Sequence, residues 1–172
     1  MTKLLLALAV LLAALPGGAF AQAPARPAAP AKPPAVSDTL TEATLSKATL
    51  RAMYDAAKLP TELDVAGNLT IKVGAVTVYV LADQDRIRLM TSYSFAPRAA
   101  HPEQLDIANR INDGYIMVRA AIPPDKPGTI TIDHYILVAG GVARAYAVAV
   151  TRRFAAVVHE AIDAVDTERL LQ

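Results

Sequence analysis

The sequence predicts an α+β fold in which helices pack on an antiparallel sheet. Between residues 63 and 95, β-branched and apolar residues alternate with polar ones in short runs, which is typical of strands with one buried face. Near the C-terminus, apolar residues recur every three or four positions, as on an amphipathic helix. Helical segments and strands interleave along the chain, and this predicts the order α, three or four strands, α, β, β, α.

The first helix is predicted to begin after Ser46 and to end before Pro60. The Ser46 hydroxyl can accept a hydrogen bond from the free amides of a first helical turn, and a proline cannot continue a helix. The folded domain is therefore predicted to span residues 44–172. Apolar residues recur at helical spacing in this segment at Leu45, Leu50, Met53, Tyr54 and Ala57.

Strands are predicted on either side of the second helix. The turns that separate the first strands are Gly67-Asn68, Gly74 and Asp83-Gln84-Asp85. The second helix is predicted from Pro102, which suits a helix start, to Gly114, which suits a helix end. The predicted strands are residues 63–65, 69–73, 76–80, 87–95, 115–122 and 129–138.

The last helix follows Gly140-Gly141, which is interpreted as a turn from strand to helix. Its polar side is predicted to carry Arg144, Arg152, His159 and Asp163. Its apolar stripe should pack on the sheet. That stripe is predicted to consist of Tyr146, Val150, Phe154, Val157, Ala161 and Val165.

The N-terminal residues 1–21 have the order of a secretory signal peptide: a charge at Lys3, an apolar run from Leu4 to Leu15, and small residues before a cut between Ala21 and Gln22. The apolar run is shorter than the roughly 20 residues that span a bilayer. We therefore expect a periplasmic or secreted protein with no stable membrane anchor. Residues 22–43 are predicted to be a Pro- and Ala-rich disordered linker.

Composition excludes several classes of function. The chain has 17 Lys and Arg against 16 Asp and Glu, and the predicted signal peptide contributes only Lys3 to these charges. Without a basic excess, nucleic acid is not an expected partner. The chain has no cysteine, so disulfides, thiolate metal sites and a lipid anchor on cysteine are excluded.

No catalytic site is predicted. None of the serines lies in a G-x-S-x-G elbow, and no glycine-rich phosphate loop is present. The histidines His101, His134 and His159 lack metal-ligand spacing. We therefore predict no enzyme, no cofactor and no metal site.

Two sets of polar residues are candidates for binding. Asn109 and Asn112 should share one face of a helix, either to satisfy backbone groups, with Asn112 capping the helix end, or to line a ligand groove. Arg86 and Arg88, two apart on a strand, should share a sheet face with Arg119 nearby. Those arginines would form either a solvated polar face or a basic strip that accepts an acidic peptide.

The order of elements, with particular residues at its joints, resembles the YbjN family of bacterial sensory-transduction regulators. Ile107-Ala108-Asn109-Arg110-Ile111-Asn112 is similar to that family's two-asparagine helix, and Gly140-Gly141-Val142 to its entry into the last helix. Arg153-Phe154 would lie inside that helix. The resemblance covers roughly residues 45–165.

This resemblance implies a fold like that of type III secretion chaperones, which often dimerise and hold partner polypeptides. It implies no catalytic residues. We therefore expect an exported, non-enzymatic interaction, chaperone-like or regulatory module that binds a protein partner or a second copy of itself. The alternative is a periplasmic domain that binds a small ligand between the last helix and the sheet.

Overall fold

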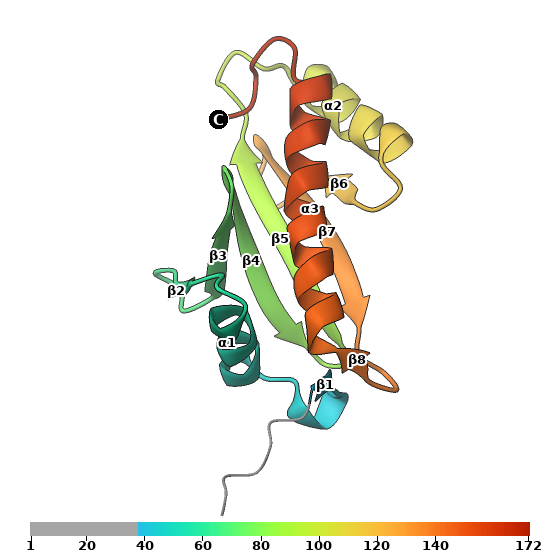
Figure 1. Ribbon diagram of the computed structural model, residues 1–172. Helices are drawn as coiled ribbons and strands as arrows, with labels where there is room; N and C mark the ends of the chain where they lie inside the picture. Colours follow the sequence, from blue (N-terminus) through green and yellow to red (C-terminus); the bar gives the residue numbers. More distant parts are fainter. Residues whose placement is uncertain (1–37) are drawn as a thin grey trace, which may run out of the picture. The chain divides into compact units, whose positions relative to one another are not determined.

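The computed structural model describes residues 38–172, so the predicted signal peptide and residues 22–37 of the predicted linker lie outside the described residues. A six-stranded antiparallel sheet lies at the centre, in the order β2-β3-β4-β5-β7-β6 (Figure 1). The predicted α+β class and order of elements are confirmed. The elements are β1 (Thr39–Leu40), η1 (Glu42–Thr44), α1 (Lys47–Ala56), β2 (Thr61–Leu63), β3 (Leu69–Val73), β4 (Val76–Asp83), β5 (Arg86–Ser94), α2 (His101–Gly114), β6 (Arg119–Ala121), β7 (Thr129–Leu137), β8 (Val142–Ala143) and α3 (Arg144–Val165).

Side-chain alternation decides which face of the sheet is buried. On β4, Val78 and Val80 are buried while Tyr79 between them is half-buried, and on β5 Leu89 is buried while Arg88 is half-buried. Helices α1 and α3 pack across the buried face, and α2 lies against α3 and β6 (Figure 1). None of the helices in residues 38–172 covers the opposite face, which we call the open face.

Helix α1 begins at the predicted cap and is joined to α3 by a buried hydrogen bond. The Ser46 hydroxyl accepts from the amide of Thr49 at 3.1 Å. The Tyr54 hydroxyl lies 2.8 Å from that of Thr151, which donates to the carbonyl of Ala147, so Tyr54 must be the donor. Burial raises the pKa of Tyr54 to about 12, because the phenolate would lose its hydration.

The folded part begins before the predicted residue 44. Strand β1 pairs with β8, and Leu40 is fully buried. The pairing needs a close approach between the two segments. Gly141 has φ +94°, and a Cβ there would lie 2.9 Å from Cγ2 of Thr39. Glycine at this position therefore allows both the turn before α3 and the contact with β1.

The strand predicted over residues 115–122 is limited to β6. Residues 115–118 turn instead, with the Tyr115 amide donating to Ile111 and the Val118 amide to Tyr115. The Tyr115 hydroxyl reaches the carbonyl of Glu160 on α3 at 3.4 Å. Ile116 projects into solvent. These residues carry the chain from α2 to the sheet edge, so they cannot join the ladder.

The buried stripe of α3 is rotated from the predicted one. Phe154, Ala161 and Val165 are buried as expected, but Tyr146 is 57% exposed. A step of four residues turns a helix by about 40° more than a full turn. Two such steps separate Phe154 from Tyr146, so the Tyr146 side chain is turned away from the core. The buried stripe alternates steps of three and four through Ala147, Thr151, Phe154, Val158, Ala161 and Val165. Within residues 38–172, no helix has the length and apolar character needed to cross a bilayer.

Candidate functional site

The open face carries a cluster of three arginines around Tyr135. Arg86 and Arg88 lie on β5, Arg119 on β6 and Tyr135 on β7. Their guanidinium carbons lie 5.7, 5.8 and 5.9 Å from the centroid of the Tyr135 ring, in that order. The predicted proximity of the three arginines is confirmed, and each lies within cation–π range of one ring.

A buried carboxylate holds two of these arginines in place. Asp133 is only 3% exposed although it lies on the open face. Arg88 donates to its Oδ2 from Nη2 at 2.7 Å and from Nε at 3.2 Å. Arg119 donates from Nε to Oδ1 at 3.0 Å and from Nη2 to Oδ2 at 2.8 Å. A carboxylate bonded in this way orders both guanidinium groups and leaves their other N–H donors free to bind an anion.

The positive charges of the cluster lie nearer the surface than the negative charge of Asp133. The hydrogen bonds that Arg119 donates to Asp133, and the negative charge of Asp133, raise the pKa of Arg119; Asp85 raises the pKa of Arg86 in the same way. The side chains of Arg88, Arg86 and Arg119 are 31%, 38% and 64% exposed. The guanidinium groups therefore reach the surface while the carboxylate of Asp133 lies beneath them, so a partner meets positive charge first.

A hollow of about 580 Å³ lies beside this cluster on the open face. The Asp64–Asn68 turn forms one wall and is held by its own acid, since Asp64 Oδ1 accepts from the amides of Ala66 and Asn68. Hydrogen bonds from Asn68 lower the pKa of Asp64. The loop 121–126 forms the other wall. Residues on the floor include Tyr79, Arg88, Met90, Ser92, Thr131 and Asp133.

The two asparagines do not join this cluster. Asn112 bonds the backbone of Ala120 on β6 twice: its Oδ1 accepts from the amide at 2.7 Å, and its Nδ2 donates to the carbonyl at 3.0 Å. It therefore holds an edge strand and does not cap α2 as predicted. Asn109 is exposed and makes no hydrogen bond within residues 38–172. The structure therefore shows backbone bonding for Asn112 and none for Asn109 among the described residues.

Replacing Asn112 with alanine is expected to destabilise the protein by about 1–2 kcal/mol, because both backbone groups of Ala120 lose their partner at the sheet edge. Asn109→Ala is the matched control on the same helix and should change the free energy of unfolding by less than about 0.5 kcal/mol. Urea denaturation of the two variants measures the difference. Equal effects would contradict the role assigned to Asn112.

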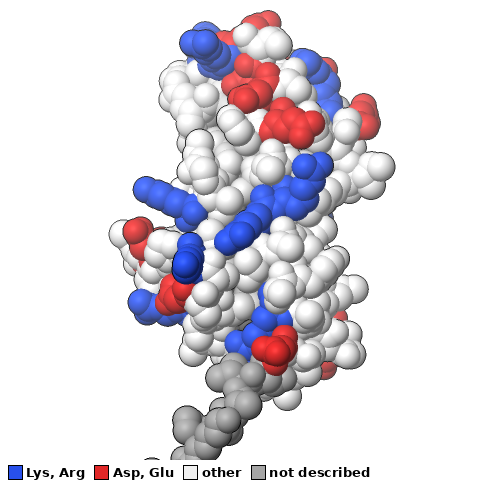
Figure 2. Space-filling model, viewed as in Figure 1, with Lys and Arg blue, Asp and Glu red and all other residues white. Residues whose placement is uncertain are grey.

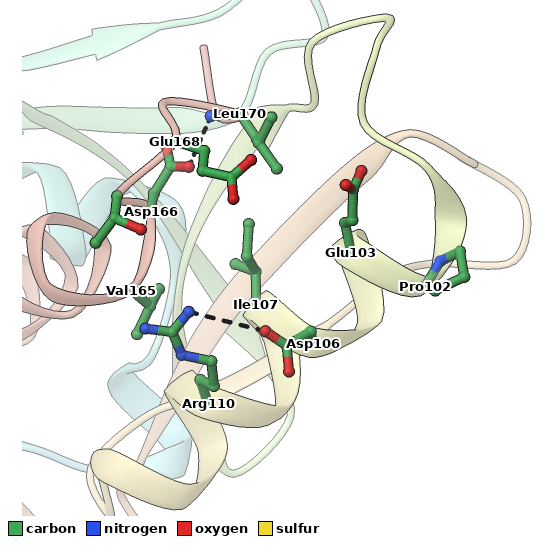
Figure 3. Close-up of a pocket in the computed structure, with 10 residues that line it drawn as sticks. Pro102, Glu103, Asp106, Ile107, Arg110, Val165, Asp166, Glu168 and Leu170 are labelled. Carbon is green, nitrogen blue, oxygen red and sulfur yellow. Dashed lines mark hydrogen bonds and ion pairs between the residues drawn. The ribbon is translucent and has the colours of Figure 1, made fainter.

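A second hollow, of about 300 Å³, lies between α2 and the C-terminal segment (Figure 3). Three of its four acids have structural partners, and the fourth, Glu168, is exposed at the chain end. Asp166 accepts from the amides of Leu170 and Leu171, and Asp106 pairs with Arg110 at 3.8 Å. Glu103 accepts from the amide that precedes α2. Most of the carboxylates in this hollow are therefore used to cap α2 and to hold the chain end.

The helix-covered face has mixed charge. Figure 2 shows basic side chains across its middle and acidic ones toward the end where α2 lies. His159 pairs with Asp163 at 3.5 Å on this side of the molecule. In the part of the chain that the structure describes, no three His, Asp or Glu side chains are placed to bind one metal ion. The open face is therefore the stronger candidate site.

Asp133 and Tyr135 are the members of the cluster that sequence reasoning missed. Their alternation on one predicted strand placed them on the same face, which was the available signal. Their partners come from elsewhere in the chain: Met90 and Arg119 flank Asp133, and Arg88 lies opposite Tyr135. No local sequence pattern predicts which residues of β5 and β6 lie opposite Asp133 and Tyr135.

Comparisons with known proteins agree on one family. The family model YbjN, described as "Putative bacterial sensory transduction regulator", matches residues 46–167. The crystal structure of YbjN from E. coli is similar over 73% of this chain and 94% of that chain, with a TM-score of 0.60 and 19% identity. At this identity the likeness shows a shared fold. Among curated proteins, none matches this chain.

Proposed function

The chain belongs to the YbjN family, and we propose that it works as an exported, non-enzymatic protein-binding module with a regulatory role. The observation that carries the proposal is the arginine cluster on the open face. Arginine and tyrosine are enriched where proteins meet other proteins. Here they line a sheet face that none of the described helices covers.

Export and regulation have separate support. The order of residues 1–21 is that of a secretory signal peptide, and the family is described as one of regulators of sensory transduction. The partner we propose is a protein, either another polypeptide or a second copy of this chain held in a chaperone-like manner.

Photo-crosslinking from the open face tests this function. A photoreactive amino acid at Ser92, on the floor of the hollow, should yield an adduct with a second polypeptide in the periplasmic or extracellular fraction. The same group at Ala149, an exposed position on α3, is the matched control and should not. The partner is identified by mass spectrometry and must bind again when both proteins are purified. Adducts from neither position, with folded protein recovered, would refute the proposal.

An intact mass that begins at Met1 would refute cleavage before Gln22.

The alternative, a small-ligand-binding domain, has one observation in its favour. The predicted pocket between α3 and the sheet is filled, since Phe154 and Val158 are fully buried. A groove of about 670 Å³ lies instead between α1 and α3. Nε of Arg144 at this groove is buried and has no hydrogen-bond partner within residues 38–172. An apolar molecule with an anionic group would suit it.

A further inference from the structure

Strand β7 is only partly covered by its edge neighbour. Strand β6 pairs with residues 131–133 of β7, whereas β5 pairs with β7 from Thr129 to Leu137. The last part of β7 therefore has a neighbour on one side only, as Figure 1 shows at its lower end. Leu137 there is 62% exposed. We call residues 135–137 the free edge.

The backbone groups that point outward at the free edge can be identified. In an antiparallel sheet, successive residues of a strand direct their N–H and C=O groups to alternate sides. The Val138 amide donates to Asp85, and the Gly128 carbonyl accepts from Phe95, both toward β5. Even-numbered residues therefore face β5. Tyr135 and Leu137 face outward, and the described residues place no strand opposite them.

We propose that the free edge accepts an extended acidic segment of a partner protein as an added strand. This inference rests on the proposed function and deepens it. Unpaired N–H and C=O groups are a template for strand addition. Residues opposite each other across such a pair share a sheet face, so a side chain opposite Tyr135 lies on the open face beside Arg119 and Arg88. A carboxylate in that position meets their free donors.

Charge disfavours a second copy of this chain as the occupant of the free edge. Two free edges paired about a two-fold axis would bring two arginine clusters together, and like charges opposite one another destabilise a sheet. The acids nearest to the cluster do not change this result. Asp133 lies beneath Arg88 and Arg119, and Asp85 pairs with Arg86, but three arginines against two acids leave each cluster with a net positive charge. An acidic strand from a different protein therefore fits best.

A synthetic peptide tests the site directly. The probe is a labelled nine-residue peptide that alternates glutamate and threonine, and binding is measured by fluorescence anisotropy. The full chain should bind it, and binding should weaken as salt is raised from about 0.05 to 0.5 M. A peptide with lysine in place of glutamate, and one with N-methylated backbone amides, should each bind at least about tenfold more weakly.

Leu137→Pro separates strand addition from attraction to the arginines. Proline is tolerated in an edge strand where its missing N–H faces solvent, and it removes one donor of the free edge. Leu137→Pro should raise the Kd at least about tenfold, while Leu137→Ala, which keeps the N–H, should stay within about threefold of the native protein. Circular dichroism and thermal melting confirm that each variant folds.

Hydrogen exchange gives a second readout that needs no variant. The amides of Tyr135 and Leu137 should become protected when the acidic peptide is added. The inference is overturned if they stay unprotected, or if folded Leu137→Pro binds as the native protein does. If Arg88→Gln loses binding while Leu137→Pro does not, the peptide binds the arginines of the open face without adding a strand. That result would overturn the inference but leave the proposed function standing. No peptide bound and no partner crosslinked would overturn both.

Discussion

Replacing Phe154 with alanine is expected to lower the free energy of unfolding by about 3–5 kcal/mol, the range for truncating a buried phenylalanine. Phe154 is fully buried, and Ala155, Val158 and Ala161 around it on α3 are almost inaccessible. The surrounding structure cannot close a ring-sized cavity, because the helix backbone fixes the positions of these neighbours. Marginal stability of about 5–15 kcal/mol makes such a loss a large fraction of the total.

Tyr146→Ala is the matched control on the same helix. The sequence pattern placed Tyr146 and Phe154 in one stripe, yet Tyr146 is 57% exposed. Its truncation should change the free energy of unfolding by less than about 1 kcal/mol. Chemical denaturation of both variants measures the contrast. Similar losses would mean that α3 is rotated toward the orientation that the sequence pattern predicted.

Replacing Asp133 with alanine is expected to cost about 2–4 kcal/mol. Removing one partner of a buried charge pair leaves an uncompensated charge, which costs 3–5 kcal/mol when both groups are deeply buried. Here Arg88 and Arg119 are 31% and 64% exposed, and rehydration of these arginines reduces the loss. Asp133 itself is only 3% exposed, so its carboxylate is buried. The variant should also lose affinity for acidic peptides, because the guanidinium groups lose their fixed positions.

Asp85→Asn is the control for the loss of stability expected from Asp133→Ala. Asp85 bonds Arg86 at 2.7 Å in the same cluster, but its side chain is 37% exposed. Exposed pairs contribute about 0–1 kcal/mol, so little change in stability is expected. Thermal and urea denaturation of the two variants would show whether burial sets the difference. A loss as small for Asp133→Ala as for Asp85→Asn would contradict the structural role of the buried carboxylate.

Most elements of this fold could be predicted because their signals are local. The Ser46 cap, the alternation of Val76, Val78 and Val80, and the glycines at 140 and 141 each act within a few residues. The predictions failed where distant segments decide the outcome. Strand β1 forms only because β8 pairs with it, and residues 115–118 turn because the chain must leave α2 and reach the edge of the sheet.

The candidate site was predictable only in part. Periodicity placed Arg86 and Arg88 on one strand face, and the structure confirms their proximity to Arg119. Asn109 and Asn112 were chosen by the same reasoning, but α2 directs Asn112 to β6 and Asn109 to solvent. Spacing shows which residues share a face. It does not show what that face meets.

The sequence by itself determined the α+β class and the order of the elements, because caps, turns and periodic apolar residues act over a few positions. The family was indicated by the resemblance of the two-asparagine helix and of Gly140-Gly141-Val142 to known members. Tertiary structure alone decided the binding surface. Residues 88, 119, 133 and 135 come together because β5 pairs with β7 across the inserted α2 and β6. The end of β7 is left free because β6 is shorter than its neighbour. Register and strand length depend on long-range packing, which no local pattern contains.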